Sequence, residues 1–459
     1  VNGGSVLLGG SGLVTFIPGL QAGRDSFRYS IVDGSGAASM AIVNIDVKAA
    51  VSFNEAAYAF IDQSVTTQVT TSEQAFDDIV AVPGNGWLTD QAESRLAVRF
   101  DRAKQVHKVI LTGKAGVADF IRQASIVFSD GSSVLVGPVS SNGIPSVIYF
   151  THRLITGFDI VVSDVSGPAA GLSEVAAFTA LVGQVIQAQE QFHDSAVPGW
   201  TQGAEYDVTA NPPVWSITGD VYQQTVRSLA QSDDAFQLGV HSVWDTLHQG
   251  LDLRLRVRVD RIDNFEPGAT GILFGYQDND NYYRLTMSRH SSYHRLEKKV
   301  GGAFTELAHG TAGLPVGEWV NVRAIVDRGV IVVQVNGQFA LGAVDATFAS
   351  GRVGLWNSWV VSASYDKVSL LTAPPDGVIG IATLTPLTVV GEGMVSIRGI
   401  ATQLLGGFEF VIDEGLPTEQ LQKSFMDPFS VVFNFANSGS HSVNVYALDN
   451  AGLRKTGQD

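Results

Sequence analysis

The chain has 459 residues, no cysteine, and 29 Lys and Arg against 45 Asp and Glu, which gives a formal net charge of −16. The lack of cysteine excludes disulfides, thiolate metal sites and a cysteine nucleophile. The negative charge argues against nucleic acid as a partner, because phosphate neutralisation needs clustered basic residues. No apolar run reaches the roughly eighteen residues of a membrane helix, so we expect no membrane insertion.

Alternation of apolar and polar residues, which is typical of half-buried strands, recurs along the chain, whereas helical periodicity is rare. In residues 253–259, Leu and Val occupy one face and three arginines the other. Asn336-Gly337 between two apolar runs predicts a two-residue hairpin turn. With turn residues every ten positions or so, the sequence predicts an all-β chain of tandem β-sandwiches.

Residues 1–49 contain a short strand, a Gly-Arg-Asp-Ser-Phe corner at 23–27 and a strand that leads into Asp33-Gly34. This pattern resembles the cadherin-like or Ig-like repeats of large bacterial adhesins, but only the second half of a repeat is present. We therefore expect the chain to be a piece of a longer modular protein. The missing strands would lie upstream or come from a neighbouring molecule.

Residues 50–183 contain a Trp loop at 86–90, strands at 96–101 and 106–111, and a Leu-Ser-Glu-Val segment at 172–175. They resemble the discoidin, or coagulation factor C-type, galactose-binding jelly roll. The resemblance implies a calcium ion that ties an early loop to the last strand, with ligands at Asp77, Asp78 and Glu174. The loop departs from the usual pattern because Ile follows Asp78, and surface acids with a helix cap are the alternative.

Residues 186–372 resemble the concanavalin A-like sandwich of laminin G-type and thrombospondin C-terminal modules, through 271–278, 281–285 and 351–356. Asp194 and Asp366 should lie on adjacent first and last strands, where they could hold a structural calcium. The acidic run 278–281 lacks EF-hand spacing and predicts a turn. After a Pro-containing linker at 373–377, residues 378–459 resemble a bacterial Ig-like or fibronectin-type domain.

Two groups of side chains are candidates for glycan binding. Exposed aromatic rings stack on sugars, and arginines pair with the carboxylates or sulfates of acidic polysaccharides. Cross-strand carboxylates could instead neutralise the arginines on a solvated face. The candidate residues are Trp87, His152, Arg153, Arg254, Arg256, Arg258, Tyr282 and Tyr293.

No metalloprotease, serine hydrolase or nucleotide-binding motif is present, so the sequence predicts a protein that is not an enzyme. We expect a fragment of a large secreted or surface-displayed bacterial adhesin, stabilised by calcium, that binds glycans or cell-surface polysaccharide. Two alternatives stay open. One is a structural filament or matrix subunit that binds copies of itself through its end domains by strand complementation. The other is a polysaccharide-degrading enzyme with accessory modules.

Overall fold

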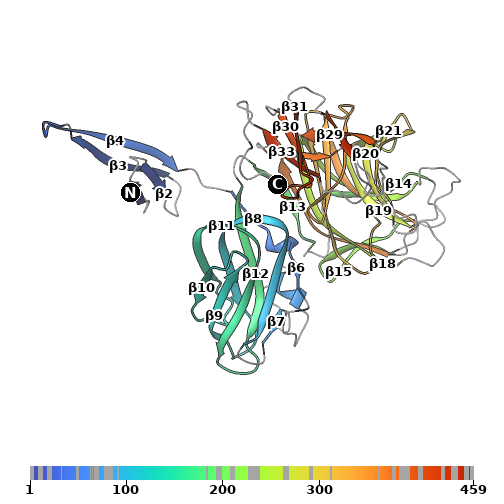
Figure 1. Ribbon diagram of the computed structural model, residues 1–459. Coiled ribbons are helices and arrows are strands. Elements are labelled where there is room, and N and C mark those ends of the chain that lie inside the picture. The colour runs from blue at the N-terminus through green and yellow to red at the C-terminus, as the bar shows by residue number, and fades with distance from the viewer. Residues whose placement is uncertain are drawn as a thin grey trace. The chain divides into compact units, whose positions relative to one another are not determined.

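A computed structural model describes most of the chain, namely residues 5–8, 14–17, 23–32, 34–47, 51–62, 64, 66, 72–76, 86–89, 93–181, 184–192, 199–206, 212–225, 238–261, 268–288, 293–310, 313–359, 362–374, 379–381, 393–401, 407–424, 430–435, 443–448 and 454. Regular structure in these residues is almost entirely β (Figure 1). The only helices among them are two short 3-10 turns, η1 (Ala56–Tyr58) and η2 (Ser72–Phe76). The predicted all-β class, with sandwich sheets, is confirmed.

The chain divides into two compact units, Val1–Phe53 with Ala180–Val182, and Asn54–Thr179 with Gly183–Asp459. The first unit contains two separate hairpins, built from β1 (Ser5–Leu8) with β2 (Val14–Ile17) and from β3 (Gly23–Val32) with β4 (Ala38–Val47). Apolar side chains of the second hairpin are open to solvent, since Ile31 is 62% and Met40 78% exposed.

The second unit begins with a sheet of order β10-β9-β11-β8-β12, to which β6 and β7 add at β8 and β12. Register shifts between Tyr149 and Arg153 and between Ile155 and Gly157 interrupt the pairing of the two longest strands. Such bulges bend strands, so β8 and β11 curve around one buried cluster. The strands of this sheet are β6 (Phe60–Ile61), β7 (Trp87–Leu88), β8 (Arg95–Gly113), β9 (Ile121–Phe128), β10 (Ser133–Val136), β11 (Ser146–Val165) and β12 (Gly171–Leu181). The short strand β5 (Val51–Asn54) belongs mostly to the first unit.

Two antiparallel sheets form the next sandwich. One has the order β15-β16-β27-β18-β23-β24-β25 with β13 on β27, and the other has the order β14-β17-β26-β19-β20-β21-β22. The strands are β13 (Ile186–Glu190), β14 (Trp200–Ala204), β15 (Trp215–Thr218), β16 (Val221–Gln224), β17 (Val240–Gln249), β18 (Leu251–Arg261), β19 (Ala269–Asp278), β20 (Asn281–Ser288), β21 (Tyr293–Val300), β22 (Ala303–Gly310), β23 (Val320–Asp327), β24 (Val330–Val335), β25 (Gln338–Val344), β26 (Ser350–Ser358) and β27 (Ser362–Thr372).

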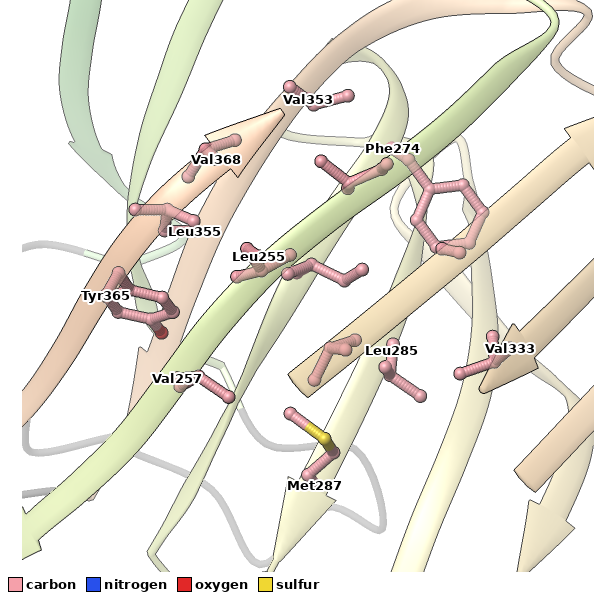
Figure 2. Close-up of a cluster of buried hydrophobic side chains, with 14 of the residues drawn as sticks. Leu255, Val257, Phe274, Leu285, Met287, Val333, Val353, Leu355, Tyr365 and Val368 are labelled. Atoms are coloured by element: carbon pink, nitrogen blue, oxygen red, sulfur yellow. The ribbon is translucent and has the colours of Figure 1, made fainter. Parts of the chain in front are cut away.

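The core of this sandwich lies between the two sheets (Figure 2). Leu255 and Val257 of β18 meet Phe274 of β19 and Leu285 of β20 in one cluster of buried side chains. The predicted alternation in residues 253–259 is confirmed, because the Leu and Val side chains are buried in that cluster. The predicted hairpin between β24 and β25 is also confirmed, with left-handed backbone at Asn336 (φ 49°) and Gly337 (φ 74°).

Near the C-terminus two small three-stranded sheets have the orders β28-β29-β32 and β31-β30-β33. Their strands are β28 (Ile379–Ile381), β29 (Gly393–Ala401), β30 (Gly407–Ile412), β31 (Gln420–Ser424), β32 (Ser430–Phe435) and β33 (Val443–Leu448). Phe408 and Phe410 of β30 are fully buried. Within the described residues, no helix has the length and hydropathy that a membrane span requires.

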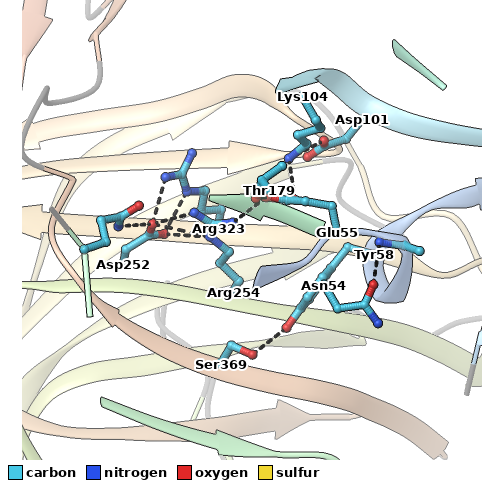
Figure 3. Close-up of polar contacts among 12 residues, drawn as sticks. Asn54, Glu55, Tyr58, Asp101, Lys104, Thr179, Asp252, Arg254, Arg323 and Ser369 are labelled. Carbon is cyan, nitrogen blue, oxygen red and sulfur yellow. Dashed lines mark hydrogen bonds and ion pairs between the residues drawn. The ribbon is translucent and has the colours of Figure 1, made fainter. Parts of the chain in front are cut away.

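A buried network of charges links residues near η1 and on β8 to β18 and β23 (Figure 3). The Lys104 ammonium lies 2.9 Å from Glu55, and the Arg254 guanidinium lies 3.4 Å from the same carboxylate. Asp252, which is 0% exposed, binds Arg254 at 2.9 Å and Arg323 at 2.7 Å. Burial alone would raise the pKa of Glu55, but its cationic neighbours outweigh it and hold this pKa at about 2. The network therefore stays ionised at neutral pH.

We predict that Asp252→Asn strongly destabilises the chain, because it removes the buried charge that Arg254 and Arg323 share and leaves Arg254 with Glu55 alone. The expected loss in the free energy of unfolding, measured in urea, is about 3–5 kcal/mol. Asp164→Asn is the matched control, since this carboxylate is 51% exposed and lies 3.5 Å from Arg122. The control should change stability by less than about 0.5 kcal/mol. Equal losses in the two variants would contradict the prediction.

Candidate functional site

The sheet that runs from β14 to β22 has a face opposite the core, which we call the outer face. Successive residues of a strand point to opposite sides of the sheet. Leu355 of β26 and Leu285 of β20 belong to the core, so their neighbours Trp356 and Arg284 point to the outer face. This face carries its own buried cluster, formed by Val243, Ala269, Leu273, Tyr276, Tyr282 and Trp356 with Phe304 packed on it.

A pocket of about 500 Å³ lies on the outer face at the adjacent strands β14, β17, β26 and β19. This volume is within the range of about 300–1,000 Å³ found for small-ligand sites. Its lining residues are Thr201, Gln202, Gly203, His241, Val243, Tyr276, Gln277, Asp278, Asn279, Asp280 and Arg352. Most of these residues have polar side chains, but apolar atoms make up the larger share of the exposed wall.

A bulge in β19 brings Tyr276 to the pocket. In a regular strand, Tyr276 would share a face with Phe274, which is in the core. The register with β20 shifts after Phe274, and Gly275 adopts the left-handed region with φ +59°. The extra residue turns Tyr276 onto the outer face, where it joins the second cluster. No Cβ fits at Gly351, since it would lie 2.3 Å from the Gly275 carbonyl carbon.

Tyr276 is held in place by several neighbours. Its hydroxyl donates to Asn279 Oδ1 at 2.7 Å, and its ring is stacked with Tyr282 at 5.9 Å between centroids. The Arg352 guanidinium lies 5.2 Å from its ring centre and donates to the Gln277 carbonyl at 2.9 Å. Burial raises the pKa of Tyr276 to about 12. The phenol is therefore a fixed, uncharged part of the pocket wall.

His241 forms the wall beside Gly203. Its side chain is 4% exposed, and its Nδ1 has no hydrogen-bond partner in the described part of the chain. A Cβ at position 203 would lie 2.6 Å from His241 Nε2, so glycine leaves the space that the imidazole ring occupies. Burial lowers the pKa of His241 to about 4. The ring is therefore neutral at pH 7.

A buried ionic cluster lies next to the pocket, centred on Glu205. This carboxylate accepts hydrogen bonds from Trp356 Nε1 at 2.8 Å and from the Tyr282 hydroxyl, and it lies 3.4 Å from Arg284. Burial alone would raise the pKa of Glu205, but Arg284 and Lys299 outweigh it and lower the pKa. Lys299 also donates to the Asn279 carbonyl at 2.7 Å, so the cluster anchors the turn at the pocket rim.

The turn at 278–281 is built by its own side chains. Asp278 Oδ1 accepts from the Asp280 backbone N–H at 2.9 Å and from Asn281 Nδ2 at 2.8 Å. Asn279 Nδ2 donates to the Ala204 carbonyl at 2.9 Å, which ties the turn to β14. The sequence predicted a turn here, and that prediction is confirmed. Its place at the rim of a pocket was not predicted.

The aromatic candidates from the sequence need correction. Trp87 was expected on an exposed loop, but its side chain is 0% exposed and belongs to the core of the β8–β12 region, so it offers no surface to a sugar. Tyr282 is also 0% exposed and lies behind Tyr276 as its stacking partner. Tyr293 is 8% exposed and stacks on His309 at 5.9 Å. None of the three is among the residues that line the pocket.

The basic candidates are bound to carboxylates. Arg254 is buried in the network around Asp252, Arg256 lies 3.9 Å from Asp366, and Arg258 lies 2.6 Å from Asp260. The structure thus agrees with the alternative in which carboxylates neutralise these arginines. It gives no open row of arginines for an acidic polysaccharide. These guanidinium groups are engaged within the protein.

His152 and Arg153 lie on β11, and the Arg153 guanidinium lies 5.0 Å from the ring centre of the core residue Phe128. The exposed His152 ring stacks on His107 with centroids 5.1 Å apart. Arg153 donates to Ser132 at 2.5 Å and lies 3.4 Å from Asp130, so it is bound to the turn between β9 and β10. The structure does not bring them together with Trp87 on one exposed surface, because Trp87 is in the core.

Three of the five calcium candidates, Asp77, Asp78 and Asp194, lie outside the described residues. Glu174 is buried on β12, and Asp366 on β27 lies beside Arg256. Among the described residues, no group of three His, Asp or Glu side chains is arranged to hold a metal ion.

Residues 54–178 match the model of a protein family described as a domain of unknown function, DUF7402. No curated protein matches the chain. Three similar solved structures each cover about two fifths of this chain.

The first is the carbohydrate-binding module CBM66 from Bacillus subtilis, with 16% identity and a TM-score of 0.31, covering 37% of this chain and 93% of that one. The second is a Bacillus subtilis protein of unknown function with a galectin-like fold, with 13% identity and a TM-score of 0.33, covering 41% and 97%. The third is porphyranase B from Zobellia galactanivorans, with 6% identity and a TM-score of 0.31, covering 41% and 92%.

We predict that His241 makes the chain less stable in mild acid. Its folded-state pKa is about 4 against an ordinary value of 6.5, so between these pH values the unfolded chain binds more protons and stability falls as pH falls. His241→Phe should lose less stability than the parent chain between pH 6.5 and 4, by on the order of 3 kcal/mol. Urea unfolding at pH 7, 5.5 and 4.5 measures this.

The control for this experiment is His309→Phe, which removes an imidazole that is 41% exposed. It should leave the pH dependence of the parent chain in place. An unchanged pH dependence in His241→Phe would mean that the ring is not held neutral in the folded chain.

Proposed function

We propose that the sandwich of residues 186–372 binds a glycan in the outer-face pocket. The observation that carries this proposal is one cavity of about 500 Å³ lined by a guanidinium group, two carboxylates, a hydroxyl, an imidazole and a tyrosine ring. Sugar hydroxyls both donate and accept hydrogen bonds, so they need donors and acceptors side by side. Arg352 supplies donors, and Asp278 and Asp280 supply acceptors.

The rigidity of the pocket supports a binding function. Tyr276 is fixed by Asn279 and Tyr282, and Asn279 is fixed in turn to the Ala204 carbonyl. Side chains that are already ordered lose little conformational entropy when a ligand arrives. Gly203 adds to this order, because its missing side chain lets the His241 ring pack closely against β14.

For a polysaccharide-degrading function, a candidate pair of carboxylates is Glu205 and Glu297. They lie close to each other, since they are 3.4 Å and 2.6 Å from the same side chain, Arg284. A glycosidase needs one carboxylic acid with a raised pKa to protonate the leaving group. The pKa of Glu205 is instead lowered, since Arg284 and Lys299 outweigh the effect of burial. Its oxygens are also occupied by Trp356 and Tyr282. Glu205 is therefore better suited to a structural ion pair than to the role of general acid.

We further propose that the chain acts outside a bacterial cell, as the adhesive part of a larger surface protein. The cysteine-free all-β composition supports this proposal.

An alternative role as a structural subunit has support from the β3–β4 hairpin, which pairs with no third strand in the described residues. Its exposed Ile31 and Met40 form an apolar surface that contact with another molecule would bury.

We predict that Arg352→Met weakens glycan binding at least about tenfold, because a hydrogen bond from a charged donor contributes about 1.5–3 kcal/mol. A glycan array identifies the ligand, and calorimetry measures the affinity. Arg122→Met is the matched control, since its guanidinium is 52% exposed on β9. Equal binding by both variants and the parent chain would place the ligand elsewhere.

We predict that calcium raises the melting temperature of the parent chain by about 4 °C or more relative to EDTA, as expected for a ligand bound by the folded state. Glu174→Gln should lose this calcium-dependent difference if the discoidin-like region holds the ion, and Asp366→Asn if the concanavalin A-like sandwich does. The comparison is made within each variant, so a general loss of stability does not affect it. Identical melting with calcium and EDTA in the parent chain would argue against calcium.

A further inference from the structure

Carboxylates outnumber cations at the pocket. Arg352 is the one basic residue among those that line it, whereas Asp278 and Asp280 contribute two carboxylates. Arg352 is already partly engaged, because it donates to the Gln277 carbonyl at 2.9 Å and lies 3.8 Å from Asp245. Asp280 extends into solvent at the rim, with 66% of its side chain exposed. The local charge is therefore negative.

The nearest buried cation cannot reverse this balance. Lys299 is 5% exposed and donates to the Asn279 carbonyl at 2.7 Å, behind the turn. It lies 3.5 Å from Glu205 and 3.9 Å from Asp280, so its charge is divided between two carboxylates and only partly offsets that of Asp280. His241 contributes no positive charge at neutral pH, since burial keeps its imidazole uncharged. A ligand carboxylate or sulfate in the pocket would thus meet one partly neutralised guanidinium and two carboxylates.

The whole chain has the same sign, with a net charge of −16. Like-charged surfaces slow the approach of a charged ligand and select against it. The other basic surface that could attract an anion, the row of arginines on β18, is occupied by Asp252, Asp366 and Asp260. These three arginines therefore offer no open row to an anionic polysaccharide.

We propose that the pocket selects uncharged, hydroxyl-rich glycans and rejects uronate and sulfated ones, with Asp278 and Asp280 as the residues that set this specificity. The inference rests on the proposed function. Each carboxylate has a second use for a neutral sugar, because it accepts hydrogen bonds from adjacent hydroxyls. The same two groups thus bind a neutral sugar and repel an acidic one.

The first experiment measures the binding of the full chain to two sets of probes by calorimetry and on an array. The neutral set is laminarin, levan, β-1,4-galactan, xylan and mannan. The anionic set is alginate, polygalacturonate and κ-carrageenan. Binding within the neutral set alone is expected. Tighter binding of an anionic member would overturn the inference, and binding of none at millimolar concentration would overturn the proposed function as well.

The second experiment uses a matched pair of ligands. The neutral glycan that binds best, or a soluble derivative of it, is partly converted to carboxylates by oxidation or carboxymethylation. We expect the charged form to bind at least tenfold more weakly in 20 mM salt, with a smaller difference in 300 mM salt because ions screen the repulsion. Equal affinity for the two forms at low salt would sink the inference, even if the neutral glycan binds well.

Variants then test whether Asp278 and Asp280 are the residues that repel the charged glycan. In Asp278→Asn/Asp280→Asn, an amide oxygen can still accept the hydrogen bonds that build the turn, and the ratio of charged to neutral affinity should rise at least fivefold. Asp164→Asn/Asp220→Asn removes the same charge at two carboxylates that do not line the pocket, one on β11 and one in the turn between β15 and β16, and should leave the ratio unchanged. If Arg352→Met keeps full affinity for the neutral glycan, the pocket is not the site and the proposed function fails. If it loses affinity but the Asp278/Asp280 variant keeps the parent ratio, only the specificity inference fails.

Discussion

The alternation of side chains along each strand is the constraint on which the rest of the structure depends. A sheet that gives every second side chain to a core has an equal number left for its other face. In the sandwich of β13–β27, the inner residues close one core, and the outer residues of the β14–β22 sheet are too large and too apolar to be left to solvent. Trp356 and Tyr282 are both fully buried there. The large side chains of the outer face therefore have to pack against one another, and each buried polar group there needs a hydrogen-bonding or ionic partner.

Buried ion pairs fix the geometry of two dense polar regions of the chain. Glu205 on the outer face and Asp252 in the network near η1 each lie between two cations, and each has a lowered pKa although burial alone would raise it. Such clusters contribute less to net stability than their number of contacts suggests, because desolvation offsets the attraction. Their larger effect is on geometry, since an ion pair out of register leaves a buried charge without a partner. Near the pocket, this requirement fixes Lys299 and through it the 278–281 turn.

The sequence predicted the elements better than it predicted the site. Period-two alternation identified β18, and the Asn336-Gly337 turn identified the β24–β25 hairpin, because each of these signals is local. Trp87 shows the opposite case. A Trp next to glycines looks like an exposed loop residue, and only the pairing of β7 with β12, more than eighty residues further along the chain, reveals that it fills the core.

The row Arg254, Arg256 and Arg258 was ambiguous for a related reason. Whether a guanidinium is open to a ligand depends on the strand that lies beside it, and the partners that occupy these three come from β18 itself, from β27 and from near η1. The acidic turn was predictable from its composition, but its neighbour β14 was not. Polar groups that are brought together from distant strands leave no joint pattern in the sequence.

The position of the pocket follows from one backbone irregularity. Were β19 regular after Phe274, Tyr276 would point into the core, and the outer face would lack the ring that Asn279, Arg352 and Tyr282 hold in place. The bulge at Gly275 needs a left-handed residue and a neighbour without a side chain, and Gly351 on β26 meets the second requirement. Bulges recur next to functional sites because they re-aim a side chain without ending the strand. The two glycines thus account for the presence of the pocket at this end of the outer face.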